Sequence, residues 1–153
     1  MINRLVSPRI VAAFSIFVVC LAPGVHGQTK KQRFDPDGSF WIKGNAPDGF
    51  LDFAGINLNG KKLRRLPTAG VQLNNGKNFR FQTINVSQER FVFTTVVLSN
   101  ISYGFTGRFL RGGVFESANL DDETPVLEGT LTKFSSGKKV AESKLKFVYF
   151  GGT

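Results

Sequence analysis

The chain's single cysteine and single histidine, Cys20 and His26, are the side chains best suited to nucleophilic or metal chemistry. Both lie within residues 1–27, where two arginines precede a short apolar run that ends in small residues. This pattern is typical of a secretory signal peptide. Cleavage before Gln28 would leave residues 28–153 without a thiol nucleophile, a Ser-His-Asp triad or the usual zinc ligands. We therefore predict a non-catalytic mature protein with no catalytic residue, no metal site and no cofactor.

The apolar run from Ile10 to Ala22 also indicates where the protein is located. As a helix it would reach about 20 Å at about 1.5 Å per residue, whereas a bilayer's hydrocarbon core is about 30 Å thick. The sequence therefore predicts no membrane span and a secreted protein, extracellular or periplasmic. Lipid attachment at Cys20 is disfavoured because the bulky Val19 precedes it. The predicted organisation is a signal peptide over residues 1–27 and a single secreted domain over residues 28–153.

Basic residues are the next group that could bind a partner. The chain has 20 Lys and Arg against 11 Asp and Glu, and the densest cluster is Lys61, Lys62, Arg64 and Arg65. These four side chains could bind sulfate, phosphate or carboxylate groups of an acidic polymer or a glycan. Alternatively, they guard an open sheet edge against pairing with another chain. No motif indicates a specific nucleic-acid partner, and the oligomeric state is left open.

A second candidate binding site combines aromatic and basic side chains. If Phe91–Leu98 and Ile101–Phe109 pair around Ser99-Asn100, then Phe91 and Phe93 lie on the same sheet face as Arg108. Aromatic rings beside an arginine suit a sugar or an acyl chain. The alternative is that the two rings simply fill the core.

Carboxylates are the remaining source of general acid and base chemistry. The loop around Asp35 and Asp37 resembles the start of a calcium loop, but the later ligands are missing, so turn chemistry is the better interpretation. Glu128 and Glu142 are predicted on solvated faces. A carboxylate-based hydrolase or isomerase is therefore the third hypothesis of function.

Turn motifs predict how the strands pair. The sequence Asn74-Asn75-Gly76 predicts a three-residue loop that sets Val71 opposite Phe79. Asn59-Gly60 predicts a two-residue loop that sets Ile56 opposite Leu63.

The C-terminal stretch predicts one more hairpin. A three-residue loop over 135–137, with Gly137 left-handed, sets Leu127 opposite Leu145 and Glu128 opposite Lys144. This register keeps apolar residues on one face and charged residues on the other.

Short alternating strands, frequent glycine turns and no amphipathic helix predict an all-β fold. We expect one antiparallel β-barrel or β-sandwich of about eight to ten strands. The chain's many phenylalanines would fill its core.

The leading functional hypothesis is a module that binds a surface ligand or serves a structural role in the extracellular space or envelope. The alternative is a small barrel, similar in architecture to lipocalins, that carries an apolar small molecule. The lipocalin Gly-x-Trp signature is not reproduced, because Trp41 stands one position late after Gly38.

Overall fold

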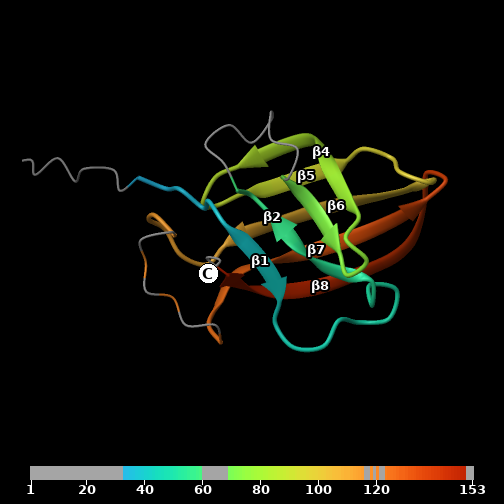
Figure 1. The fold of residues 1–153 in the computed structure, drawn as a ribbon. Helices are drawn as coiled ribbons and strands as arrows, with labels where there is room; N and C mark the ends of the chain where they lie inside the picture. The colour runs from blue at the N-terminus through green and yellow to red at the C-terminus, as the bar shows by residue number, and fades with distance from the viewer. Residues whose placement is uncertain (1–32, 60–68, 116–117, 119, 121–122, 151–153) are drawn as a thin grey trace, which may run out of the picture. The chain divides into compact units, whose positions relative to one another are not determined.

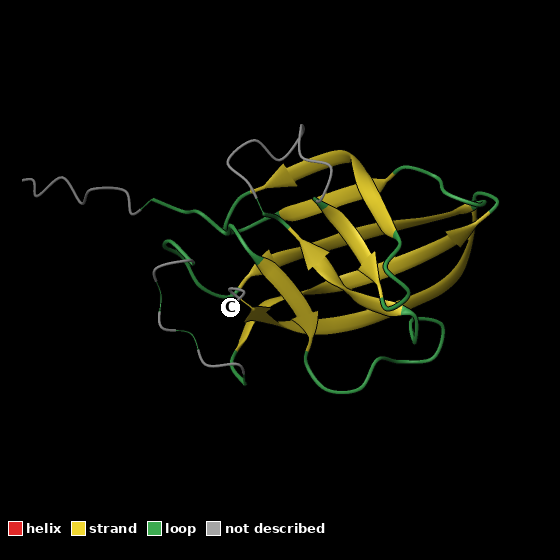
Figure 2. Ribbon diagram, viewed as in Figure 1, coloured by secondary structure: helices red, strands yellow, loops and turns green. Residues whose placement is uncertain are grey.

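The computed structural model describes residues 33–59, 69–115, 118, 120 and 123–150, and these ranges contain strands and no helix (Figures 1 and 2). None of the described residues belongs to a helix that is long and apolar enough to cross a membrane. The eight strands are β1 Ser39–Ile42, β2 Phe53–Asn57, β3 Gly70–Leu73, β4 Asn78–Val86, β5 Phe91–Thr95, β6 Ile101–Phe109, β7 Pro125–Ser135 and β8 Lys138–Phe150.

The strands form a closed barrel in which each strand pairs antiparallel with the next one in the chain. β8 closes the barrel by pairing with β1, where Ser39 lies opposite Phe150 and Ile42 lies opposite Phe147. The predicted all-β class is therefore confirmed, and of the two predicted architectures the structure is the barrel. Closure removes the free sheet edges that a sandwich would have.

The hairpin between β3 and β4 confirms its prediction. Val71 lies opposite Phe79, and Gly76 takes the left-handed φ of 80° that the three-residue loop requires. The predicted pairing of Ile56 with Leu63 is wrong, because Ile56 pairs with Val71 on one side and with Phe40 on the other. Residues 60–68 lie outside the described part of the chain.

The β7–β8 hairpin differs from its predicted register by two residues. Its turn has two central residues, Ser136 and Gly137, with φ of 49° and 76°, and an irregularity follows at Lys133 and Phe134. Leu127 therefore lies opposite Phe147 instead of Leu145, and Glu128 lies opposite Lys146 instead of Lys144. Side chains alternate with a period of two, so a shift of two residues leaves each on its predicted face.

The β5–β6 hairpin differs in a way that changes faces. Its turn is Ser99-Asn100 as predicted, with Leu98 bridged to Ile101. Further along, however, Phe93 lies opposite Phe105, one residue out of the register that the turn sets. The one-residue shift turns the β5 side chains over relative to β6, so Phe91 and Phe93 point into the barrel.

The barrel interior is packed with aromatic rings. Phe93 and Phe105 stack with ring centroids 5.6 Å apart, and Phe105 meets Phe147 edge-on at 5.7 Å. At one end, Phe40, Phe109, Phe115 and Tyr149 form a cluster of edge-on contacts that seals the interior. The opposite end holds the turns at 74–76, 99–100 and 136–137 and the loop 43–52; there the backbone N–H of Ser136 donates to the carbonyl of Asn100.

Candidate functional site

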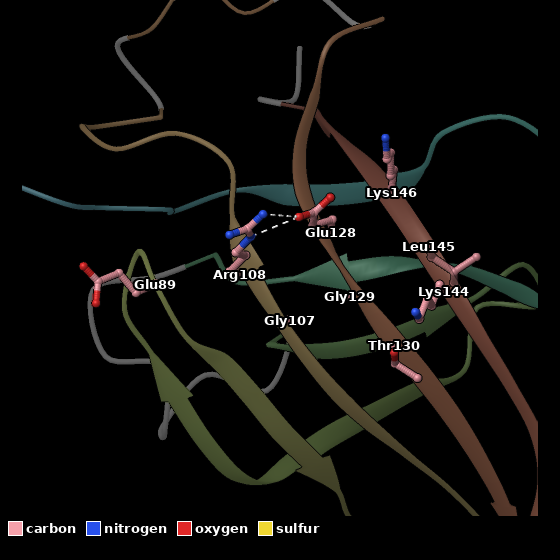
Figure 3. A pocket seen from close by; sticks show the side chains of 9 residues that line it. All are labelled: Glu89, Gly107, Arg108, Glu128, Gly129, Thr130, Lys144, Leu145 and Lys146. Atoms are coloured by element: carbon pink, nitrogen blue, oxygen red, sulfur yellow. Dashed lines mark hydrogen bonds and ion pairs between the residues drawn. The ribbon is translucent and has the colours of Figure 1, made fainter.

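A groove of about 530 Å³ lies on the outer face of the wall formed by β6, β7 and β8 (Figure 3). Its polar side chains project from alternate positions of these strands and include Arg108, Glu128, Thr130, Lys144 and Lys146. The inward positions between them carry core residues such as Leu131 and Phe147. Strict alternation of the strands therefore places a charged surface directly outside the aromatic core.

The floor of the groove includes Gly107 and Gly129, which lie opposite each other in β6 and β7. Only glycine fits at these positions, because the ring of Phe105 packs against both from the inside. A β-carbon on Gly107 would lie 2.2 Å from the carbonyl oxygen of Glu128 and 2.7 Å from the Phe105 ring. A tightly packed layer of residues therefore lies directly behind the floor of the groove and holds it in place.

The charges of the groove are only partly paired. Arg108 donates from Nε and Nη2 to one oxygen of Glu128, at 3.0 and 2.8 Å. Lys144 and Lys146 are exposed, and neither has an ion-pair partner within the part of the chain that the structure describes. Two cations thus stand free beside a neutralised pair, and Glu89 is the other charged residue that lines the groove, so the groove has a net positive charge that suits an anionic ligand.

An aromatic pair continues the same row of outward positions along β8. Lys144, Lys146, Val148 and Phe150 follow one another on this face, and Trp41 of β1 lies opposite Val148. The rings of Trp41 and Phe150 lie 5.1 Å apart and are tilted by 39°. Their exposures of 48% and 41% leave ring surface open to solvent. We call the outward row Lys144, Lys146, Val148 and Phe150, together with Trp41, the β8 strip.

The residues predicted from the sequence as binding residues divide into three groups. Lys61, Lys62, Arg64 and Arg65 lie outside the described residues, so their role stays a prediction. Phe91 and Phe93 are 0% and 1% exposed, and the predicted face that they share with Arg108 is wrong, because Arg108 points outward. The two phenylalanines are core residues, which was the alternative interpretation, and Arg108 lines the groove.

Sequence reasoning missed the β8 strip. The alternation of lysine with apolar residues over 144–147 is the signal that could have indicated an exposed basic row. Its aromatic half could not have been found in that way, because Trp41 reaches Phe150 only through closure of the barrel.

The acidic side chains in the described ranges offer few groups suited to metal binding or to general acid catalysis. No three Asp, Glu, His or Cys side chains gather there as metal ligands would. Glu142 accepts hydrogen bonds from Lys139 and Thr132, which hold the pKa of this exposed carboxyl below its ordinary value. A lowered pKa keeps Glu142 ionised, which is the opposite of what a general acid needs.

The fold and the groove together define a class: a closed, up-and-down, eight-stranded antiparallel β-barrel with a basic and aromatic outer face. Comparison with protein-family models, curated protein sequences and solved structures finds no match for this chain.

Proposed function

We propose that residues 28–153 form a secreted, non-catalytic β-barrel module that binds an anionic glycan along the β8 strip and the adjoining groove. One observation carries this proposal: two lysines without an ion-pair partner among the described residues share an outward row of β8 with the exposed ring of Phe150, and the exposed ring of Trp41 on β1 lies beside Phe150. The ring-packed interior behind this wall supports a binding surface on the outside rather than a carried ligand inside.

The two halves of the strip suit the two chemical parts of an anionic glycan. Sugar rings present apolar C–H faces that pack against aromatic rings such as Trp41. Sulfate and carboxylate groups accept charge-assisted hydrogen bonds from ammonium groups such as Lys144 and Lys146. Successive outward positions on a strand stand about 7 Å apart, from a rise of about 3.4 Å per residue. The strip therefore offers several contacts to an extended polymer.

The test replaces the free cations and measures retention on immobilised heparin, used as an anionic glycan. Lys144→Gln/Lys146→Gln should elute at clearly lower salt than the wild type, because two ionic contacts to sulfate or carboxylate groups of the glycan are lost. The matched control is Lys77→Gln/Lys138→Gln, which removes the same charge at exposed lysines away from the strip. Equal losses in the two double variants would contradict a localised site.

A second variant separates glycan recognition from general attraction of charge. Trp41→Ala keeps every charge but removes the larger exposed ring. We expect roughly tenfold weaker binding to a heparin oligosaccharide, the size of effect that about 1.4 kcal/mol produces, with unchanged retention on a sulfopropyl resin. An unchanged affinity for the oligosaccharide, or equally strong competition by duplex DNA, would overturn the glycan proposal.

The basic cluster Lys61, Lys62, Arg64 and Arg65 is proposed as a further contact for the same polymer. Replacing all four with Gln should lower heparin retention without causing aggregation. Unchanged heparin retention in this variant would show that the cluster does not contact the polymer.

A further inference from the structure

Aliphatic side chains are exposed at the end of the barrel that holds the three hairpin turns and the loop 43–52, which we call the turn end. Leu51, in the loop before β2, is 67% exposed, and Val97, just before the β5–β6 turn, is 65% exposed. Val97 stands between Val96 and Leu98, which are also exposed. A run of three exposed apolar residues is unusual on a water-facing surface unless it has a function.

The exposed aliphatic side chains belong to neighbouring parts of the turn end. The side-chain amide of Asn74 donates to the carbonyl oxygen of Leu51 at 3.0 Å, which holds the loop against the β3–β4 turn. The β5–β6 turn meets both of them at a small hollow, which Asp52 and Asn75 line together with Leu98. The loop and the two turns therefore meet around one hollow. We call their exposed aliphatic residues, Leu51, Val96, Val97 and Leu98, the apolar tip.

The unpaired charges around the apolar tip are mostly positive. Lys77 lines the same hollow, and Lys138 directly follows the β7–β8 turn. Arg80 is the neighbour of Val96, whose backbone N–H donates to the Arg80 carbonyl oxygen at 2.9 Å. All three basic side chains are exposed, and none has an ion-pair partner among the residues that the structure describes.

The acidic side chains of the turn end do not cancel this positive charge. Asp52 is paired with Lys133, and Glu142 is paired with Lys139, at 3.1 Å in each case. Of the carboxylates that the structure describes at this end, Asp48 alone has no ion-pair partner. The turn end therefore combines an aliphatic surface with a net positive charge.

We propose that the turn end docks on the surface of an anionic lipid bilayer, with the apolar tip between the headgroups and the three unpaired cations against the lipid phosphates. Insertion removes aliphatic surface from water, and cations near an anionic bilayer add electrostatic attraction. A protein partner fits less well, because valine and leucine are under-represented among the residues that dominate protein interfaces. A second copy of the chain would bring the same cations face to face.

The first experiment measures the affinity of protein from a secreting host for vesicles of phosphatidylglycerol and phosphatidylcholine in equal parts, with pure phosphatidylcholine vesicles as the reference. Lys77→Gln/Lys138→Gln should bind the anionic vesicles about 10- to 30-fold more weakly, since each lysine near such a surface contributes about a factor of five. Lys144→Gln/Lys146→Gln removes the same charge from the barrel wall and should bind nearly as well as the wild type. Equal losses in the two double variants, or equal binding to both kinds of vesicle, would overturn the proposal.

The second experiment tests whether the apolar tip inserts. In a Trp41→Phe background, Val97→Trp carries the one tryptophan of the chain. Its fluorescence should shift to the blue on anionic vesicles and should be quenched by lipids with brominated acyl chains. Leu110→Trp in the same background is the control, because Leu110 is exposed and follows β6 at the opposite end of the barrel. The control should show neither effect, and an unchanged Val97→Trp signal on bound vesicles would refute insertion.

A third variant removes apolar surface and keeps every charge. Leu51→Ser/Val97→Ser should keep the wild-type melting temperature, because both side chains are exposed, and should bind anionic vesicles at least about tenfold more weakly. Its heparin retention should equal that of the wild type, because the β8 strip is intact, and this result separates failure of docking from failure of glycan binding. An unchanged vesicle affinity would refute the role of the apolar tip. A dimer in sedimentation equilibrium that this variant abolishes would show that a second copy covers the tip and would overturn the proposal.

Discussion

A single methyl group added at Gly107 tests whether the packed layer behind the groove is as tight as the geometry indicates. The new β-carbon would lie 2.2 Å from the carbonyl oxygen of Glu128 and 2.7 Å from two carbons of the Phe105 ring. The oxygen belongs to the backbone of β7 and cannot rotate away, so β6 and β7 must separate or Phe105 must leave its place. Overpacking of this kind lowers the free energy of unfolding by about 1 to 3 kcal/mol. Because the contact is with a backbone atom, we expect Gly107→Ala to lower it by about 3 kcal/mol.

Gly104 on the same strand is the matched control. A β-carbon there would meet its nearest neighbour, a ring carbon of Phe134, at 3.4 Å, which is ordinary contact. Neither glycine has a left-handed φ, so conformational strain does not enter the comparison. Gly104→Ala should leave stability unchanged or raise it by up to about 1 kcal/mol, because alanine reduces the freedom of the unfolded chain.

The assay is thermal and chemical unfolding of both variants beside the wild type. For a domain of this size, about 3 kcal/mol corresponds to a fall in melting temperature of roughly 10 °C. Gly107→Ala should show that fall, and Gly104→Ala should not. Equal melting temperatures for the two variants would refute the reasoning, because they would mean that the barrel wall yields easily at the groove.

Three further predictions concern the core, a surface carboxyl and the leader. Leu131→Ala, at a fully buried position, should lower the free energy of unfolding by about 2 to 5 kcal/mol, whereas the exposed Val140→Ala should change it by less than about 0.5; similar losses in denaturant titrations would contradict the observed β7–β8 faces. Lys139→Met should raise the pKa of Glu142 toward its ordinary value in a carboxyl NMR titration. Because the folded-state pKa is lowered, this interaction stabilises the fold above the unfolded-state pKa, and the stabilisation is lost as the pH falls through the folded-state pKa; an unchanged pKa in the variant would exclude Lys139 as the main cause. Protein from a secreting host should begin at Gln28 and contain no thiol by intact mass and thiol titration; a product that keeps Cys20 would remove the chemical exclusions based on cleavage.

The sequence predicts which face a residue occupies more securely than it predicts its partner. In β7 and β8 the apolar alternation is strong, and Leu127, Leu131 and Leu145 all lie on the predicted inner face. Their partners are wrong because the turn is one residue shorter than predicted and an irregularity at Lys133 and Phe134 adds a second shift of one residue. No turn motif encodes that irregularity. In β5 the alternation is weak, since Val92 stands between Phe91 and Phe93 and makes both faces apolar. The one-residue error there inverted the predicted faces of Phe91 and Phe93.

The candidate site was predictable only in part, for a reason that lies in the topology. Arg108 was found because aromatic residues accompany it within one hairpin. The β8 strip was missed because Trp41 of β1 is far in the sequence from the β8 residues of the strip and meets them only through the pairing of β1 with β8.

The short strand that closes the barrel also determines how the protein can come apart. The strands from β2 to β8 are joined by consecutive pairings, whereas among the described residues only the four residues of β1 pair with both β2 and β8. Release of β1 would leave two adjacent strands with unpaired backbone groups, ready to accept the same segment from another molecule. The closing pairing also joins the most distant parts of the sequence, so its loop-closure entropy is the largest in the fold. We therefore expect the backbone amides of β1 to exchange hydrogen in the native state faster than those of the β7–β8 hairpin. We also expect domain-swapped dimers in which β1 of each molecule pairs with the other molecule. Uniform exchange across all eight strands would show instead that the barrel opens only as a whole.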